Sequence, residues 1–279
     1  MGFNAMPASR ARQTERLMGK IIKLDRSAVQ ITGPDAPKLL HDTLTCNLSR
    51  SLEGKAHWFA LLAPQGKMLV EGLISETEGG FLLDIPAAEL ENFSKRMRLY
   101  KMRADVTITP RQDLNVGWSQ SANAATVEDA RPGMGFRLYA PDASGWETNQ
   151  AHYHQARISS TIMEMDSDFD ANSLFPHDIG MDELGSVDFK KGCYIGQEVV
   201  SRMQHRGTAR KRPIAVQGDG LKAGDNILHT GKSVGSVTSS AGNTGIALVR
   251  LDKVTDADAC SINDQPVKLA VPSWASYAF

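Results

Sequence analysis

The chain has 279 residues, of which 41% are hydrophobic and 23% are charged, and this composition excludes a chain that is fibrous or disordered throughout. The formal net charge of -1 gives no overall attraction to nucleic acids or anionic membranes, so either partner would need a local basic patch. No apolar run approaches the roughly 20 residues that cross a bilayer, so we expect no membrane partner.

The cysteines and the N-terminus bear on the location of the protein. Cys46, Cys193 and Cys260 lie far apart and form no CxxC pair, which fits a reducing compartment. The first 16 residues hold three arginines, and a frayed or mispredicted bacterial start explains them better than a transit peptide, because a strand-like run begins at Lys20. We therefore predict a cytoplasmic protein, or a mitochondrial matrix protein if the source is eukaryotic.

The first half of the chain alternates strands and helices. Residues 21–31 predict a pair of short strands, and the proline-rich entry and spaced leucines of residues 33–44 predict a helix. Three further strands are predicted at residues 56–62, 67–74 and 81–86, with a hairpin turn at residues 63–66 between the first two. A helix with one apolar face is predicted over residues 86–102.

A second alternation follows. Strands are predicted at residues 105–110, 114–119 and 135–140, and a helix at residues 147–162. From Arg212 onward the pattern changes to short strands separated by Gly, Asn and Asp turns, and no helix is predicted there. This last part is typical of a small antiparallel barrel or sandwich.

The charge of the chain reverses sharply after Asp188. Eight acids and no Lys or Arg lie between Glu164 and Asp188, whereas Lys190 to Arg212 holds seven basic residues against one acid, Glu198. A solvated acidic loop beside a basic surface is the usual explanation of such runs. The basic run also contains an unusual cysteine, and this favours a functional role.

Cys193 lies in the run KKGCYIGQE, between two glycines and beside lysines. The following residues, QEVVSRM, predict a short helix with Glu198 and Arg202 four residues apart. A thiol near a helix N-terminus and near lysines is stabilised as a thiolate, which favours nucleophilic attack or metal binding. A lone cysteine is more often buried and inert, but the flanking glycines and charges favour the reactive interpretation.

The remaining cysteines and the histidines are predicted to be structural. Cys46 and Cys260 have no second ligand at metal-binding spacing, so we expect no permanently bound metal. One thiolate cannot hold an iron–sulfur cluster alone, because such a cluster usually takes about four ligands, and any cluster would have to be shared with a partner. A catalytic Cys–His pair that folding brings together is a further alternative, with His177 or His205 as the candidate histidine.

The run FKKGCYIGQEVVSRMQHRG resembles the K-G-C-Y-x-G-Q-E motif of the YgfZ family of folate-binding proteins, which are relatives of the T-protein (aminomethyltransferase) of glycine cleavage. The resemblance extends to LLHDTLTCNL and ALLAPQGKMLVEGLI near the N-terminus, to FPHDIGMDELGSVDF before the motif, and to SVGSVTSSAGNTGIALVRL after it. It covers nearly the whole chain.

The resemblance implies an α+β fold with two ferredoxin-like units in a ring around a central folate cavity, followed by a C-terminal antiparallel β-barrel. The expected limits are residues 20–110, 111–206 and 207–279. The resemblance also implies tetrahydrofolate or another folate as cofactor. The implied role is assembly or repair of iron–sulfur clusters in client enzymes, such as a tRNA methylthiotransferase, which would support tRNA modification indirectly.

The motif also implies site residues. Cys193 corresponds to the key thiol of the family, and Lys191 is the second candidate for a catalytic role. The residues predicted to bind the cofactor are Tyr194, Gln197, Glu198, Arg157 and Arg202, and Tyr100 is a further candidate for the pterin wall.

One departure from the glycine-cleavage relatives bears on the activity. Their catalytic Asp corresponds here to Val70 or Glu71, depending on the alignment. Val cannot accept a proton, and Glu displaces the carboxylate by a methylene, so an accessory factor is favoured over an enzyme. A folate-dependent one-carbon (aminomethyl) transferase stays open as an alternative. An RNA-binding module that uses the basic run ranks last, because no RNP-like aromatic pattern supports direct binding of nucleic acid.

Overall fold

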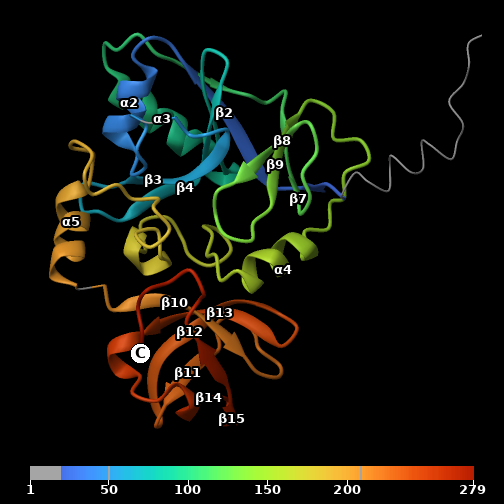
Figure 1. The fold of residues 1–279 in the computed structure, drawn as a ribbon, viewed down its shortest axis with the longest axis vertical. Coiled ribbons are helices and arrows are strands. Elements are labelled where there is room, and N and C mark those ends of the chain that lie inside the picture. Colours follow the sequence, from blue (N-terminus) through green and yellow to red (C-terminus); the bar gives the residue numbers. More distant parts are fainter. Residues whose placement is uncertain (1–19, 50, 208) are drawn as a thin grey trace, which may run out of the picture.

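The computed structural model describes residues 20–49, 51–207 and 209–279 (Figure 1). The strands form two sheets, a large mixed sheet with most of the helices around it and a smaller antiparallel barrel at the C-terminal end. Among the described residues, no helix is long and apolar enough to cross a membrane. The interpretation of residues 1–19 as a bacterial start lies outside the described residues.

The large sheet has nine strands in the order β1-β7-β9-β8-β3-β4-β5-β2-β6. In chain order its strands are β1 (Ile22–Lys23), β2 (Arg26–Thr32), β3 (Lys55–Leu62), β4 (Met68–Thr77), β5 (Gly80–Pro86), β6 (Thr107–Pro110), β7 (Asn115–Ser119), β8 (Thr126–Asp129) and β9 (Phe136–Ala140). All neighbours are antiparallel except β3 and β8, which pair in parallel through Lys55 with Glu128 and Ala56 with Asp129. That parallel pairing joins the two halves of the sheet.

In the described part of the chain, four α-helices and short 3-10 turns accompany the strands. The α-helices are α2 (Ala36–Thr43), α3 (Leu90–Lys101), α4 (Ala151–Ser159) and α5 (Gln197–Arg206), and the 3-10 turns are η1 (Ala87–Glu89), η2 (Pro176–Ile179), η3 (Leu251–Lys253) and η4 (Ala257–Ala259). Proline in the first turn of α2 fits the fixed backbone angle that a helix start needs. Gly207 ends α5 in the left-handed conformation, in which glycine meets no Cβ clash.

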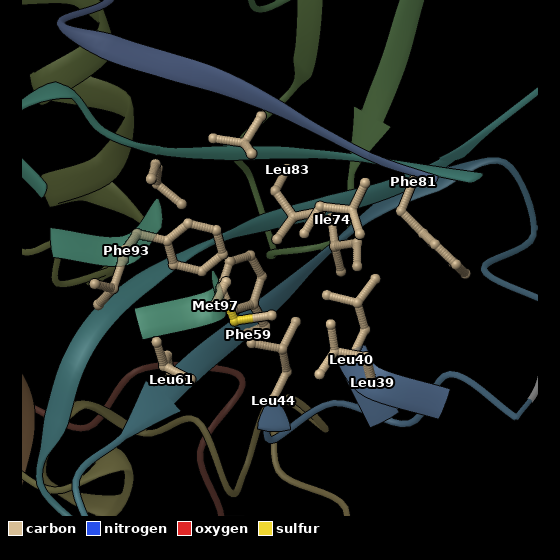
Figure 2. Packing of buried hydrophobic residues seen from close by; sticks show 14 of the residues in the cluster. Leu39, Leu40, Leu44, Phe59, Leu61, Ile74, Phe81, Leu83, Phe93 and Met97 are labelled. Atoms are coloured by element: carbon tan, nitrogen blue, oxygen red, sulfur yellow. The ribbon is translucent and has the colours of Figure 1, made fainter. Parts of the chain in front are cut away.

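The apolar faces of α2 and α3 cover one face of the first half of the sheet (Figure 2). Leu40 of α2 and Leu44, at the C-terminal end of this helix, contact Phe93 and Met97 of α3. These four side chains pack on Phe59 of β3, and all five residues are fully buried. Each such side chain contributes about 1.5–3 kcal/mol by leaving water. This packing gives α2 and α3 fixed positions on the sheet.

The barrel contains seven antiparallel strands in the order β15-β14-β11-β12-β13-β10-β16. They are β10 (Lys211–Gln217), β11 (Asn226–His229), β12 (Lys232–Ala241), β13 (Thr244–Arg250), β14 (Cys260–Ile262), β15 (Gln265–Pro266) and β16 (Lys268–Ala270). Helix α4 contacts β12 and β13, so it lies between the large sheet and the barrel (Figure 1). The α+β class and the C-terminal barrel are confirmed.

Several local predictions differ from the structure. The strands predicted as a pair over residues 21–31 do not pair with each other, because β1 joins β7 whereas β2 lies between β5 and β6. Strand β8 was not predicted, and the helix predicted over residues 147–162 is shorter, at Ala151–Ser159. Since strands from residues 20–110 and from residues 111–206 share one sheet, the limit between these two units stays a prediction.

Candidate functional site

The cysteine loop, residues 188–196, begins at a carboxylate that orders its backbone. Oδ1 of Asp188 accepts hydrogen bonds from the backbone N–H groups of Lys190 (2.6 Å) and Lys191 (2.8 Å), and Oδ2 accepts one from Asn47 (2.6 Å). Burial works against ionisation, but these donors hold the pKa of Asp188 below its ordinary value. The start of the loop is therefore tied to the segment that follows α2.

Lys191 anchors the loop to the end of α2. Its ammonium donates to the carbonyls of His41 (2.6 Å), Leu44 and Cys46 (2.9 Å), which are carbonyl groups at and just beyond the helix C-terminus. The side chain is 8% exposed, and burial lowers the pKa of Lys191 to about 8, so the ammonium stays mostly protonated at neutral pH. All three N–H donors are used, which assigns Lys191 a positioning role rather than contact with a substrate.

The loop ends against the hairpin turn between β3 and β4. Gly196 has φ +81°, and a Cβ at this position would stand 2.6 Å from the carbonyl oxygen of Ala63 and 3.2 Å from the Cα of Gly66. Gly66 in turn lies against Val199 of α5. Two of the segments that carry the family resemblance, APQGK and KGCYIGQE, therefore pack against each other, because glycine allows the two backbones to approach.

Within this loop, neighbouring residues point in opposite directions. Tyr194 is 6% exposed and packs in the apolar cluster that contains Leu62 and Val200. Its ring also faces the Lys191 ammonium, with 4.6 Å between Nζ and the ring centroid. Cys193 is exposed, whereas Cys46 and Cys260 are buried. The buried side chains of Lys191 and Tyr194 thus fix the backbone before and after Cys193, and Cys193 itself is exposed to solvent.

Helix α5 follows the loop and is confirmed. Glu198 and Arg202 form the expected pair across one turn, with 3.6 Å between Oε1 and Nη2, and their side chains are 91% and 49% exposed. Gln197 is half-buried at the first position of the helix. All three residues lie close to Cys193 in sequence, and the charged groups of Glu198 and Arg202 face mainly solvent.

The structure does not bring the other predicted residues to this loop. Arg157 is 1% exposed on α4, where its guanidinium contacts Asp168, the carbonyl of Ile162 (3.2 Å) and Oγ of Ser239 in the barrel (2.8 Å). Tyr100 packs against the α2–α3 core. Arg157 thus fastens α4 to β12, and neither residue lies beside Cys193 among the contacts of the described residues.

No hydrogen bond joins Cys193 to a histidine among the described residues, and the Cys–His pair stays a prediction. His177 is fully buried, stands 3.0 Å from Oε1 of Gln204 through Nε2 and packs its ring against Phe189, and burial lowers its pKa. His205 is exposed on α5. The described residues also contain no group of three or more His, Cys, Asp or Glu side chains that could hold a metal ion.

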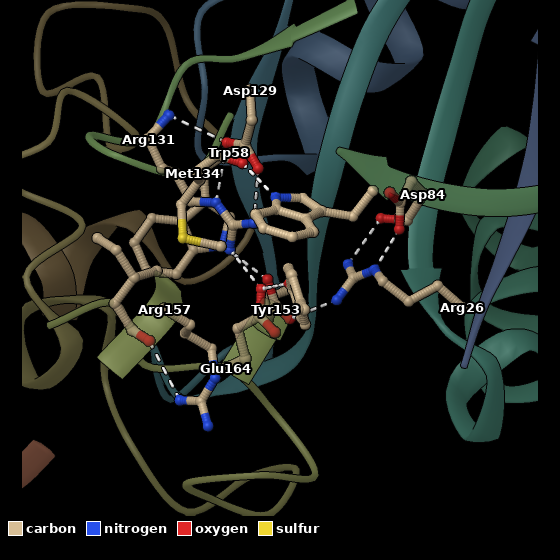
Figure 3. Close-up of polar contacts among 12 residues, drawn as sticks. Arg26, Trp58, Asp84, Asp129, Arg131, Met134, Tyr153, Arg157 and Glu164 are labelled. Atoms are coloured by element: carbon tan, nitrogen blue, oxygen red, sulfur yellow. Dashed lines mark hydrogen bonds and ion pairs between the residues drawn. The ribbon is translucent and has the colours of Figure 1, made fainter. Parts of the chain in front are cut away.

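A buried chain of alternating charges lies between the two halves of the large sheet (Figure 3). In order of contact, its members are Glu71, Arg26, Asp84, Arg137, Asp129, Arg131 and Glu164. Distances along it include 3.3 Å for Arg26 to Glu71, 3.2 Å for Arg137 to Asp84 and 2.8 Å for Arg131 to Glu164. Sequence reasoning missed this network, although lone charges in apolar strands, such as the Glu in MLVEGLI and the Asp in FLLDI, are a signal for it.

Glu164 ends this network beside a cavity. Burial opposes its ionisation, but Arg131 and the neighbouring arginines hold the pKa of its carboxyl well below the ordinary value. Arg131 and the hydroxyl of Tyr153 both donate to Oε1, and no hydrogen bond within the described residues reaches Oε2. The cavity has a volume of about 310 Å³, and its lining comprises Leu24, Asp25, Arg26, Pro86, Gln150, Tyr153, His154, Glu164, Met165, Asp166 and Ser167.

This cavity fits part of a folate. Its volume is at the lower limit for small-molecule sites, so it suits a pterin ring rather than the whole molecule. A carboxylate oxygen can accept the neighbouring N–H groups on the pterin edge, and Tyr153 and Met165 offer apolar walls. The acids Asp25 and Asp166 at the same cavity oppose a polyanionic glutamate tail, which would have to point outward.

The position of the T-protein aspartate is not available for proton transfer. Val70 is fully buried in the α2–α3 core. Glu71 is also fully buried, and it accepts hydrogen bonds from the indole N–H of Trp58 (2.6 Å) and from Arg26 (3.3 Å). Both carboxylate oxygens of Glu71 are therefore engaged, which weakens the transferase alternative.

The basic run is not a continuous surface either. Lys191 is buried against α2, and Arg212 is 8% exposed and forms a two-pronged ion pair with Asp182, at 2.7 and 2.9 Å. A nucleic acid would meet only the other cations of the run. This geometry weakens the RNA-binding alternative.

Comparison with known proteins gives a consistent relationship. Residues 210–277 match the family model of the CAF17 C-terminal beta-barrel domain. The chain is 29% identical to the mitochondrial iron-sulfur cluster assembly factor IBA57 of Homo sapiens, over 82% of this chain and 76% of the relative. Homologues of this chain include iron–sulfur cluster assembly factors.

Two other relatives carry the same description. The mitochondrial IBA57 of Mus musculus is 28% identical, with 89% of this chain and 83% of the relative covered. The mitochondrial IBA57 homolog of Pyricularia oryzae is 27% identical, with 83% and 71% covered. These relatives are mitochondrial by name, and a cytoplasmic location of this chain stays a prediction.

The fold is shared with a solved enzyme. The crystal structure of glycine cleavage system aminomethyltransferase T from Bartonella henselae superposes with a TM-score of 0.75, over 93% of this chain and 88% of that chain. The sequence identity is 14%, so this similarity shows the fold alone.

Proposed function

We propose that this chain is an accessory factor for the assembly or repair of iron–sulfur clusters, and that the thiol of Cys193 is its functional group. The observation that carries the proposal is the exposed thiol on a loop whose neighbours, Lys191 and Tyr194, are both buried. The similarity to assembly factors named IBA57 supports the same role. We further propose that the chain is a YgfZ-like protein whose clients include a tRNA methylthiotransferase, so that it supports tRNA modification indirectly.

The chemistry follows from the isolation of this thiol. On losing its proton, the sulfur of Cys193 can donate an electron pair to iron, forming one Fe–S bond. The described residues supply no neighbouring ligand set, and a cluster usually needs about four ligands. The other ligands must come from a partner, so Cys193 would serve in transfer or in a shared cluster rather than in permanent storage.

Tetrahydrofolate, or another folate, is the proposed small-molecule ligand. The pterin head would lie in the cavity beside Glu164 and Tyr153, with Oε2 of Glu164 accepting N–H groups and Arg26 contributing a donor. A bound folate supplies one-carbon or redox chemistry. The residues of this chain bind it, orient it and hold its polar edge away from water.

The thiol part of the proposal is tested in a strain that lacks this gene. Cys193→Ala should abolish the recovery of iron–sulfur client activity, whereas the matched control Cys260→Ala, which removes a buried thiol in the barrel, should retain it. Protein levels are measured in parallel. Full recovery by Cys193→Ala at equal protein level would show that the thiol is not used.

The folate part is tested separately by calorimetric titration with tetrahydrofolate. Wild-type protein should bind, and Glu164→Gln should bind at least about tenfold more weakly, because a charge-assisted hydrogen bond is lost. The control Glu198→Gln, on the exposed face of α5, should bind like wild type. No heat of binding with the wild-type protein would remove folate from the proposal and leave the thiol part standing.

A further inference from the structure

The C-terminal half of helix α3 presents a surface that is both apolar and basic. Three large apolar side chains are exposed among the described residues, and two of them, Leu99 (67%) and Met102 (83%), lie within one turn of each other here. The segment from residue 95 to residue 103 also contains five cations and no acid, namely Lys95, Arg96, Arg98, Lys101 and Arg103. Exposed apolar groups rimmed by charge are typical of protein-binding surfaces.

Three of these cations are available to a partner. Arg96 donates to Oδ1 of Asn92 (2.9 Å), and Lys101 donates to the carbonyl of Val106. Lys95, Arg98 and Arg103 are exposed, and no ion pair between described residues includes them. An acidic partner would therefore meet cations that are not held in an ion pair by a carboxylate of the described residues.

A groove runs along the same helix. Its volume is about 870 Å³, and its lining comprises Ala87, Ala88, Leu90, Glu91, Ser94, Lys95, Arg98, Leu99, Pro110 and Gln112. Ser94 is 5% exposed, and its Oγ has no hydrogen-bond partner within the described residues. A buried hydroxyl without a partner costs free energy that a ligand group can recover.

The backbone at the end of α3 is strained. Met102 has φ 45° and ψ -105°, a conformation that side chains other than glycine rarely adopt. Glycine would remove this strain, yet the position carries a long apolar side chain that is almost fully exposed. A residue that is both strained and exposed contributes little to folding, which indicates a role in binding.

Helix α2 links this surface to the cysteine loop. The carboxylate of Asp35, at the start of α2, accepts the backbone N–H of Asp105 (2.8 Å), three residues after Met102. The carbonyls at the other end of α2 hold Lys191, two residues before Cys193. The eight residues of α2 span about 12 Å. One partner domain can therefore contact the end of α3 and reach Cys193.

We propose that the α3 surface, comprising Lys95, Arg98, Leu99, Met102 and Arg103 with the adjoining groove, docks an acidic segment of a partner protein that places an apolar side chain in the groove. Charge complementarity favours an acidic partner, and the exposed leucine and methionine favour a protein over a nucleic acid. The apolar face of α3 with Phe93 and Met97 is buried in the core, so too few apolar groups remain for insertion into a membrane. Binding of an acidic segment at this surface is independent of the proposed function. The further claim, that the bound partner also shares an iron–sulfur cluster with Cys193, rests on the proposed function.

The test uses a fluorescein-labelled synthetic peptide of glutamates and aspartates with two leucines four residues apart, added to the full chain. Wild-type protein should raise its anisotropy, and rising salt should weaken binding because the contacts are exposed charges. Arg98→Glu and Leu99→Ser should each weaken binding by about tenfold, as expected for central interface residues. Lys222→Glu, which makes the same charge change as Arg98→Glu at an exposed position in the barrel, should bind like wild type.

Met102→Gly separates binding from folding. Relief of the strained backbone should raise the melting temperature, while loss of the apolar side chain should weaken the peptide complex. Cys193→Ser should leave peptide binding unchanged, so that failure of the thiol mechanism is distinguished from failure of the surface. The proposal would be overturned if Arg98→Glu, Leu99→Ser and Met102→Gly bound the peptide as tightly as wild type. It would also be overturned if wild-type protein bound phosphatidylserine vesicles or single-stranded RNA in preference to the peptide, and if Arg98→Glu abolished that binding.

Discussion

Gly66 and Gly196 lie so close together that a Cβ on Gly196 would stand 3.2 Å from the Cα of Gly66. Gly66 ends the β3–β4 turn, and Gly196 is the residue before α5. The contact joins two segments 130 residues apart, and it places the end of the cysteine loop against the β3–β4 turn. A side chain at either glycine would push these backbones apart.

Gly196→Ala is therefore expected to destabilise the protein by about 1–3 kcal/mol, because alanine meets both the left-handed φ and the carbonyl of Ala63. The measurement is urea unfolding followed by circular dichroism. Gly192→Ala is the matched control: its added Cβ would meet nothing within 4 Å, and its φ is not left-handed. The contact between the turns would be unimportant if both variants unfolded at the same urea concentration.

Lys191→Ala should cost roughly 3 kcal/mol of stability, because it leaves buried carbonyls near the end of α2 without a donor. It should also loosen the cysteine loop, which amide hydrogen exchange over residues 188–196 would detect as faster exchange. Lys190→Ala removes the neighbouring exposed lysine and should change neither property. Equal effects of the two substitutions would show that charge rather than anchoring matters.

Only one of the three thiols should react in the folded protein. Cys193 is exposed, whereas burial raises the pKa of Cys46 to about 12 and also raises the pKa of Cys260. Iodoacetamide at pH 8 should add one carbamidomethyl group per native chain, as mass spectrometry can count, and three after denaturation. Modification of Cys46 in the native protein at the rate of Cys193 would contradict the structure of the α2 end.

The buried charge chain predicts acid sensitivity. The pKa of Glu164 is held below its ordinary value, so its ionised form stabilises the folded state above about pH 4.5, and this contribution is lost as the pH falls toward the folded pKa. Glu164→Gln should cost roughly 3–5 kcal/mol at pH 7, since it leaves Arg131 partly unpaired.

The same variant should show a flatter fall in stability below about pH 4.5. Melting temperatures measured between pH 3 and pH 7 test both parts. The control Glu198→Gln, on the exposed side of α5, should follow the wild-type curve. A steeper acid limb in Glu164→Gln would reverse the assigned direction of the pKa shift.

Arg157 provides a test of its predicted role in folate binding. Its guanidinium contacts Asp168 and the barrel residue Ser239, and the cavity beside Glu164 is not lined by it. Arg157→Met should cost roughly 3–5 kcal/mol by leaving Asp168 buried without its partner. At a temperature where the variant is folded, its affinity for tetrahydrofolate should equal that of wild type. A selective loss of affinity would restore Arg157 to the ligand site.

Much of the local structure follows from short stretches of sequence. The APQG turn, helix α5 after KGCYIG, and the short strands with glycine turns in the barrel were all predicted from spacing and turn residues. The resemblance of KKGCYIGQE to a known motif also singles out Cys193, whose thiol is exposed in the structure. These features are encoded within about ten residues, because turns, caps and periodicity depend on near neighbours.

Only the tertiary structure decided what surrounds the thiol. Lys191 was predicted to be catalytic, but it donates to carbonyls near the end of α2, including that of His41, 150 residues away. The pairing of β1 with β7 and the charge chain from Glu71 to Glu164 likewise join distant segments. Whether a polar side chain is buried and satisfied depends on these long-range partners, and the local pattern around Cys193 contains no record of them.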